Sequence, residues 1–135
     1  GIVKALIPGD LAQRVGTTVD YSLDILRSTP VEAPFKFIDL FWDGTVELAQ
    51  LPGHACGQLG VRIHTADHTL FFATDAAWRK STLDANILPS PVVQLFFDDW
   101  GAYKVTFDAL QNYRKTNPTH RMLFTHCPET LKFIN

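Results

Sequence analysis

The sequence predicts an α+β domain in which a mostly antiparallel sheet is covered on one face by helices. Three observations favour this class. Four short apolar runs with strand-like alternation follow one another within residues 35–74. A regular helical stripe follows in residues 102–115. No internal repeat, low-complexity segment or linker divides the chain, so a single domain over residues 1–135 is expected.

The composition narrows the class of protein. The chain has 135 residues, of which 46% are hydrophobic and 19% charged, so a globular domain with a sizeable core is expected. A net charge of −2 argues against a nucleic-acid-binding protein, which normally carries a basic patch. No apolar run approaches the length of a membrane span. The 2 cysteines do not form a disulfide framework, which predicts a reduced, cytoplasmic protein.

The N-terminal region predicts one strand and helical structure. The run IVKALI (2–7) is typical of a short buried strand, and Pro8-Gly9 indicates a turn after it. Apolar residues at helical spacing then predict one kinked helix or two short helices over residues 10–28. This helical region ends before Pro30.

Two hairpins are expected next. FKFIDL (35–40) and TVELAQL (45–51) alternate with period two, and Asp-Gly in the intervening WDG supplies a positive φ at low cost. LGVRIHT (59–65) and TLFFAT (69–74) form the second hairpin across ADH. Together they predict an antiparallel meander of four strands.

The second half of the chain adds helices and one strand. In PVVQLFFDDW (91–100), Val92, Leu95 and Phe96 share one helical face. RMLFTH (121–126) is expected to be a strand, and Pro128 to lie in the first turn of a last helix. The helical stripe of residues 102–115 consists of Tyr103, Phe107, Leu110 and Tyr113.

Three polar residues follow apolar strands. His54 lies in the PGHACG turn, Asp75 comes just past LFFAT, and His126 ends RMLFT. If these strands belong to one sheet, the three side chains gather along one edge. Histidine and aspartate are typical ligands of zinc and other borderline divalent metals. The pattern therefore predicts a metal site formed by His54, Asp75 and His126.

The segments LPGHACGQLGVRI, TLFFATDAAW and RMLFTHC together resemble the C-terminal half of the metallo-β-lactamase fold superfamily, particularly its lactonase-like hydrolases. That family typically reads P-G-H-[TS]-x-G, then a hairpin whose apolar run ends in Gly-Asp, then an apolar strand ending in [ST]-H. The resemblance covers residues 45–135 and implies half of an αββα sandwich. It implies that His54 binds one metal ion, His126 a second, and that Asp75 bridges both.

The sequence also departs from this family. The signature H-x-H-x-D-H is absent, and the chain has about half the length that the complete fold requires. Thr74 stands where the family usually has Gly, and Cys56 where Pro is common. The resemblance therefore implies a truncated domain, derived from a metal-dependent hydrolase of ester, lactone or amide bonds and inactive alone. Whether the chain is an enzyme stays open; an active form would need the missing N-terminal half.

Simpler structural roles stay open for each residue. His54 is alternatively a turn histidine with local hydrogen bonds, Asp75 the N-cap of a helix beginning AAWRK, and His126 a cap of the last helix. The metal would be zinc, iron or manganese, and an empty site is the alternative. His64 and His68 are expected to be solvated. His120 is expected in a loop, and both cysteines are expected to be free.

Two classes of function follow, a hydrolase fragment and a non-catalytic assembly or partner-binding module. Without a partner, the strands FKFI, LGVRI and LFFAT would expose an apolar sheet face larger than monomers tolerate. A homo-oligomer, or a separate N-terminal half, is therefore the expected partner. A weaker third option is an unrelated metal-dependent enzyme whose homodimer builds one site from both copies.

Overall fold

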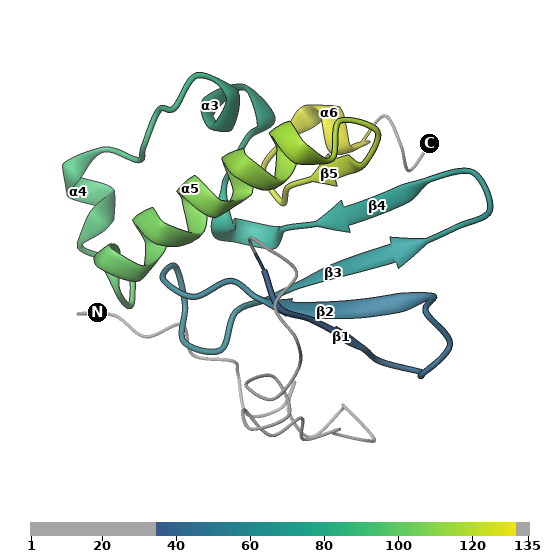
Figure 1. Cartoon of the computed structure of the whole chain (residues 1–135). Coiled ribbons are helices and arrows are strands. Elements are labelled where there is room, and N and C mark those ends of the chain that lie inside the picture. Colours follow the sequence, from purple (N-terminus) through teal and green to yellow (C-terminus); the bar gives the residue numbers. More distant parts are fainter. Residues whose placement is uncertain (1–34, 132–135) are drawn as a thin grey trace.

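The computed structural model describes residues 35–131, so the strand and helices expected within residues 2–28 lie outside the described part. The described residues form a five-stranded sheet in the order β1-β2-β3-β4-β5, together with helices (Figure 1). The strands are β1 (Phe37–Asp39), β2 (Val46–Gln50), β3 (Leu59–His64), β4 (Thr69–Phe72) and β5 (Arg121–Leu123). The helical segments are the 3-10 turn η1 (Thr74–Ala76) and the α-helices α3 (Lys80–Asp84), α4 (Pro91–Gln94), α5 (Trp100–Thr116) and α6 (Pro128–Leu131).

The predicted antiparallel meander is confirmed. Each of the strands β1 to β4 pairs with its sequence neighbour in antiparallel orientation. In the first turn, Gly44 has a φ of +74°, as expected of Asp-Gly. The fifth strand is parallel to β4, because η1, α3, α4 and α5 carry the chain back before β5 begins. The fold is therefore α+β with a mostly antiparallel sheet.

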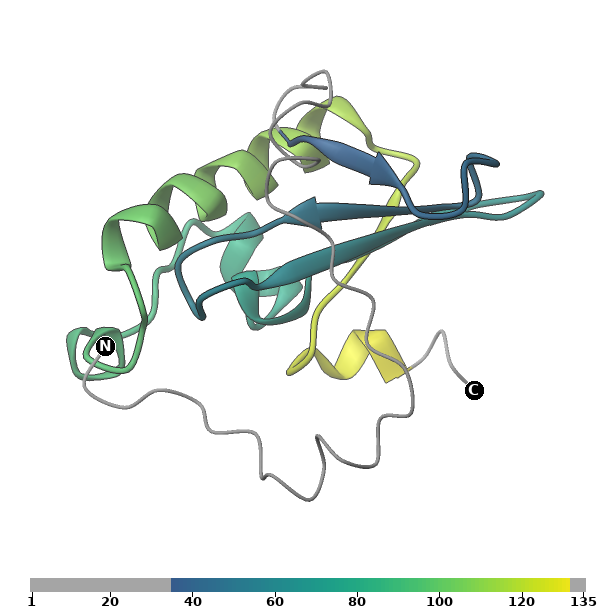
Figure 2. The ribbon, with the colours of Figure 1, turned by 90° about the horizontal axis from the view of Figure 1, so that it is seen from below.

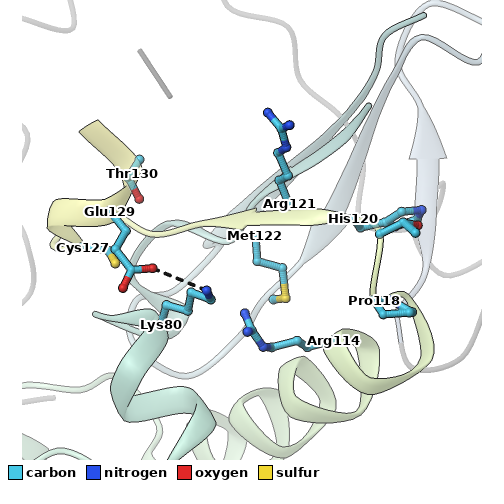
Figure 3. Close-up of a pocket in the computed structure, with 10 residues that line it drawn as sticks. Lys80, Arg114, Pro118, His120, Arg121, Met122, Cys127, Glu129 and Thr130 are labelled. Carbon is cyan, nitrogen blue, oxygen red and sulfur yellow. Dashed lines mark ion pairs between the residues drawn. The ribbon is translucent and has the colours of Figure 1, made fainter. Parts of the chain in front are cut away.

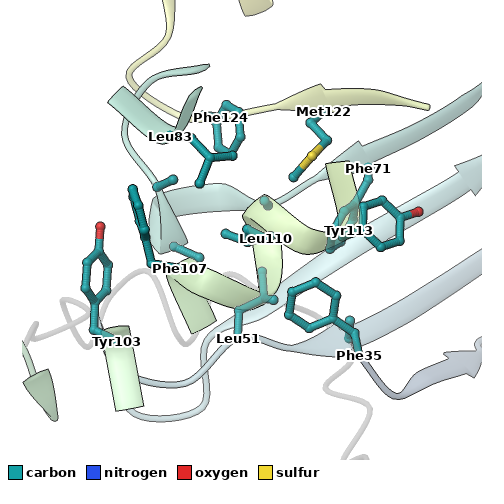
Figure 4. Packing of buried hydrophobic residues seen from close by; sticks show 14 of the residues in the cluster. Phe35, Leu51, Phe71, Leu83, Tyr103, Phe107, Leu110, Tyr113, Met122 and Phe124 are labelled. Atoms are coloured by element: carbon teal, nitrogen blue, oxygen red, sulfur yellow. The ribbon is translucent and has the colours of Figure 1, made fainter. Parts of the chain in front are cut away.

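Helix α5 covers one face of this sheet (Figures 1 and 2). Its predicted stripe is confirmed, since Tyr103, Phe107, Leu110 and Tyr113 are all buried. From the sheet, Phe71 contacts Tyr113 with ring centroids 5.0 Å apart. Figure 4 shows Phe35, Phe71 and Tyr113 close together between the helix and the strands, with Tyr103 at the other end of α5. Burial of these large side chains is the main source of stability for this layer.

Gly60 permits the close packing at the middle of the sheet. A Cβ atom at this position would lie 2.7 Å from Leu51 Cδ1 and 2.9 Å from Phe71 Cε2, both of which are buried. These distances are shorter than van der Waals contact, so any larger residue must displace core side chains.

A polar network continues the same face of the sheet beyond the core. Glu47 Oε2 accepts hydrogen bonds from Arg62 Nε at 2.5 Å and from His64 Nε2 at 2.6 Å. His64 Nδ1 lies 3.1 Å from Thr69 Oγ1. The guanidinium carbon of Arg62 lies 3.5 Å from the centroid of the Phe37 ring. The prediction that His64 is simply solvated is therefore wrong, because strand pairing places Glu47 beside it.

The opposite face of the sheet is apolar. Strand register aligns one residue from each strand in a single row across it, and every member is hydrophobic. The row consists of Ile38, Leu48, Val61, Phe72 and Leu123. Ile38 is buried and the other four are partly exposed. The predicted apolar sheet face is therefore present in the described part of the chain.

The predicted helical face in residues 91–100 is wrong. Helix α4 spans only Pro91–Gln94, and Val92, Leu95 and Phe96 are 70%, 59% and 60% exposed. The chain turns after α4 because Asp99 caps a new helix, its side chain accepting a hydrogen bond from Ala102 N at 2.9 Å. Phe97 lies in that turn and is the residue that enters the core.

Within residues 35–131, no helix combines the length and apolar character needed to cross a membrane.

We expect Gly60→Ala to lower the free energy of unfolding by about 1–3 kcal/mol, because its methyl group overlaps Leu51 and Phe71. Urea-induced unfolding measures this change. Gly57→Asn is the control, because Gly57 has a φ of +74° and open space around it, which Asn tolerates. Equal stability of Gly60→Ala and the wild type would contradict the packing described above.

We expect the Glu47 network to make stability depend on acid pH. Burial raises the pKa of Glu47, but hydrogen bonds from Arg62 and His64 outweigh it, so the pKa lies below its usual value. Because the folded pKa is the lower one, this stabilisation is present above the unfolded pKa of about 4.3 and is lost as pH falls through the folded pKa.

Unfolding of wild type and Glu47→Gln between acid and neutral pH tests this. At neutral pH the variant should be less stable by about 1–3 kcal/mol, and the difference should shrink in acid. A difference that stays constant with pH would rule out the carboxylate as its source.

Candidate functional site

The ends of β4 and β5 bring Asp75 and His126 together. The two strands are parallel, so their C-terminal ends lie at one edge of the sheet. The pairing continues past both strands, with Ala73 N donating to Leu123 O at 2.9 Å. Asp75 follows in η1, and His126 follows β5. Their side chains meet, with His126 Nε2 3.3 Å from Asp75 Oδ1.

The Asp75 carboxylate is incompletely satisfied. Oδ1 is buried and has no hydrogen-bond partner among the described residues, because the contact with His126 is close but poorly aligned. Such an oxygen carries a desolvation cost that a cation or a donor would relieve. The His126 side chain is 61% exposed, so this pair is reachable from solvent.

Asp75 also acts on a buried neighbour. Burial, and to a smaller extent the negative charge of Asp75, together raise the pKa of Tyr103 to about 12. Tyr103 is therefore a neutral phenol at physiological pH.

The turn that holds Asp75 is fixed by Gln58. With its amide oxygen turned toward η1, Gln58 accepts hydrogen bonds from the backbone nitrogens of Asp75 at 3.2 Å and Ala76 at 2.8 Å. Thr74 has a φ of +50°, a conformation that favours glycine and is strained in a β-branched residue. Its hydroxyl lies 3.2 Å from Leu59 O, which helps to hold the strained turn.

The turn that carries His54 is fixed to the start of α5. Gly53 O accepts from Asp99 N at 3.0 Å, and His54 O accepts from Asp98 N at 3.2 Å. Thr106 Oγ1 donates to Pro52 O at 2.7 Å. Gly53 has a φ of +125°, and a Cβ atom there would lie 2.2 Å from Tyr103 N. The backbone of the Pro-Gly-His turn is thus needed for packing against α5, independently of any role of the His54 imidazole.

Two aromatic rings connect His54 to His126. The His54 ring meets the edge of Phe97, with centroids 5.0 Å apart. Phe97 stacks on Trp78 at 6.4 Å, and Trp78 contacts the His126 ring at 6.0 Å. Trp78 Nε1 is buried without a hydrogen-bond partner among the described residues. No spacing signal in the sequence distinguishes Phe97 and Trp78 from other core aromatic residues.

The structure thus brings together two of the three predicted ligands. Among residues 35–131, no three His, Cys, Asp or Glu side chains are grouped so as to hold a metal ion. Asp75 and His126 have the donor chemistry of zinc, iron or manganese ligands, but they are two ligands of a site that needs more. The described residues alone therefore do not complete a metal site. The assignment of His54, Asp75 and His126 as metal ligands stays a prediction.

The structure also bears on the simpler structural roles of Asp75 and the histidines. Asp75 is not the N-cap of a helix, because α3 begins at Lys80 and Arg79 occupies the cap position. The backbone carbonyl of His54 accepts a hydrogen bond from Asp98 N, which lies outside the turn of His54. His68 is exposed, and His120 lies in a loop, as expected. Cys56 is exposed, Cys127 is buried, and both are free.

Comparison with known proteins gives matches to solved structures. No protein-family model and no curated protein matches the sequence. An N-acyl homoserine lactone hydrolase, with the product N-hexanoyl-L-homoserine at its catalytic metal center, matches with a TM-score of 0.57 and 18% identity over 72% of this chain and 36% of that one. A variant of B. thuringiensis AiiA with N-decanoyl-L-homoserine at the active site gives the same values.

A quorum-quenching N-acyl homoserine lactone lactonase matches with a TM-score of 0.52 and 20% identity, over 65% of this chain and 34% of that one. The chain therefore spans about a third of the length of the structures it matches. At these identities the likeness concerns the fold alone. The described residues have the fold of a part of the metallo-β-lactamase domain found in these lactonases.

Proposed function

We propose that this chain supplies one side of a metal-dependent hydrolase centre, with Asp75 and His126 as ligands, and that further ligands come from a second half of the fold. A lactone is the substrate class proposed, with ester and amide bonds as the wider class. The single observation that carries the proposal is the Asp75–His126 pair, whose buried Oδ1 has no hydrogen-bond partner in the described residues.

Three features support this proposal. Asp75 and His126 come from segments far apart in the sequence and meet at the strand ends of one sheet edge. The backbone nitrogens of Asp75 and Ala76 donate hydrogen bonds to Gln58, which holds the Asp75 turn in place despite the strained φ of Thr74. The fold is also shared with lactone hydrolases, one of which has a catalytic metal center.

The residues of this chain have distinct roles in the proposed centre. A divalent metal bound there would polarise the substrate carbonyl and activate water. The Asp75 carboxylate provides negative charge at the cation, and the exposed His126 imidazole provides a neutral nitrogen ligand. Trp78 packs against one side of the His126 ring, with the ring centroids 6.0 Å apart. His54 lies beyond Phe97 and would serve a separate ion, as the family resemblance implies.

The apolar face of the sheet favours a second candidate, an assembly module. The row of Ile38, Leu48, Val61, Phe72 and Leu123 crosses all five strands. A partner that covers this row removes apolar surface from water, which favours association whether or not chemistry survives. The partner proposed for the hydrolase is the other half of the sandwich, and for the assembly module it is a second copy of this chain.

We expect zinc to bind through the Asp75–His126 pair. Isothermal titration calorimetry should be done in a Cys56→Ser background, because an exposed thiol is itself a zinc ligand. Asp75→Asn and His126→Ala should each weaken binding by about tenfold or more, because each removes one of two ligands.

His120→Ala is the matched control for loss of an imidazole, and it should leave zinc affinity unchanged. His54→Ala should also have little effect in this chain alone, because His54 is outside the pair. Zinc binding that survives both Asp75→Asn and His126→Ala would contradict the proposed ligands.

We expect the chain alone not to hydrolyse N-hexanoyl-homoserine lactone, with or without added zinc, because the described residues provide only part of a site. Product formation followed by chromatography measures this. Zinc-dependent turnover that Asp75→Asn abolishes would show that this chain holds a complete centre, and the proposal of a shared centre would then be wrong.

We expect Val61→Lys to weaken self-association if the apolar row is the contact between copies. Size-exclusion chromatography with light scattering should show a smaller species for this variant than for the wild type. Val105→Lys makes the same exchange on α5, where Val105 is 71% exposed, and should leave the mass unchanged. A wild type that stays monomeric at high concentration would favour the hydrolase fragment over the assembly module.

A further inference from the structure

A second hollow lies on the helical side of the molecule and does not include Asp75 or His126. It is a cavity of about 430 Å³ between α3, the C-terminal end of α5, β5 and α6. This volume falls within the range of small-molecule sites, roughly 300–1,000 Å³. Apolar atoms of Met122 and Pro118 contribute to its lining, together with several charged side chains.

The residues that line this cavity include more cationic than acidic side chains. The cationic residues of the lining are Lys80, Arg114 and Arg121, and Glu129 is the acidic one. Figure 3 shows the Arg121 side chain extending away from the other two, so Lys80 and Arg114 supply the positive charge inside the hollow. Cations gathered around one solvent-filled hollow repel one another, and they raise the local concentration of anions. An anion placed between them would relieve that repulsion.

Lys80 and Arg114 converge on the same space. Figure 3 shows them extending from two helices toward the region beside Met122, with the Lys80–Glu129 ion pair at one side. The Lys80 pair is long, with Nζ 3.5 Å from Glu129 Oε2. Arg114 Nε lies 2.6 Å from Asp84 Oδ1, and a guanidinium has further N–H donors on its two terminal nitrogens.

His120 adds a polar group to the rim. Burial lowers the pKa of His120, and the positive charges of Arg62 and His64 lower it further, so the ring is neutral at physiological pH. Its Nδ1 lies 2.7 Å from the Tyr113 hydroxyl. When that hydroxyl donates to Nδ1, the hydrogen of the neutral ring is on Nε2, where it is a hydrogen-bond donor.

We propose that this cavity binds a small organic anion, with its carboxylate or phosphate between Lys80 and Arg114 and its apolar part against Met122 and Pro118. Arginine and lysine are the side chains that proteins use to hold such groups, the first as a fork and the second as a point charge. This site is separate from the proposed metal centre and does not depend on it.

A purely structural role for these cations explains less. Lys80–Glu129 would tie α3 to α6, and Arg114–Asp84 would tie α3 to α5. Partly exposed ion pairs of this kind contribute little to stability. Neither ion pair explains why Lys80 and Arg114 line the same cavity as the apolar side chains of Met122 and Pro118.

Titration of the full chain with hexanoate, hexyl phosphate and inorganic phosphate at low ionic strength tests the proposal, with hexylammonium as the cationic control. Calorimetry gives the affinity, and amide chemical shifts locate the site. Hexanoate or hexyl phosphate should shift the amides of Lys80, Arg121 and Met122. Lys80→Gln and Arg114→Gln should each weaken binding by about tenfold. The preferred head group distinguishes a carboxylate site from a phosphate site.

Two control variants separate binding from structure. Lys104→Gln removes an exposed positive charge from α5 outside the cavity and should leave the affinity unchanged. Asp84→Asn breaks the Arg114–Asp84 ion pair but keeps the guanidinium, so it should bind as well as the wild type or better. The proposal is overturned if none of the anions binds, if hexylammonium binds equally, or if Asp84→Asn weakens binding as much as Arg114→Gln does.

Discussion

The parallel pairing of β4 and β5 is the constraint on which the arrangement of this molecule depends. A parallel connection requires a crossover, and here the segment from η1 to the end of α5 provides it. The same crossover lays α5 across the sheet, where it buries Phe71, Phe37 and Met122. It also brings the C-terminal ends of β4 and β5 to one edge, so that Asp75 meets His126. Packing and site geometry are therefore consequences of a single strand pairing.

Several features of the candidate site are locally destabilising. Thr74 has a left-handed backbone conformation. Asp75 Oδ1 and Trp78 Nε1 are both buried without a hydrogen-bond partner among the described residues. Each of these features is unfavourable by itself, by about 1–3 kcal/mol. The aromatic layer formed by α5 and the sheet offsets this cost, because it buries many large side chains. Strain and unsatisfied groups concentrated at one edge are typical of functional sites.

The two faces of the sheet differ in polarity. The face under α5 ends in a polar network, in which Glu47 compensates the charge of the buried Arg62. The other face has no such group in its central row and consists of aliphatic and aromatic side chains. This asymmetry fits one layer of a larger sandwich, in agreement with a match to about a third of each lactonase structure.

Elements with a local signal can be predicted from the sequence. Alternation over residues 35–74 and the stripe from Tyr103 to Tyr113 were enough for the four-strand meander and α5, because period and turn residues reflect burial on one face. The strand-end positions of Asp75 and His126 were also visible in the sequence, and with them one side of the candidate site. The sequence does not predict three other features, which follow from how the chain packs. Val92, Leu95 and Phe96 are exposed, Glu47 contacts His64, and Phe97 and Trp78 lie between His54 and His126. These depend on strand register and on how helices dock, and contacts between residues distant in sequence leave no periodic pattern along the chain.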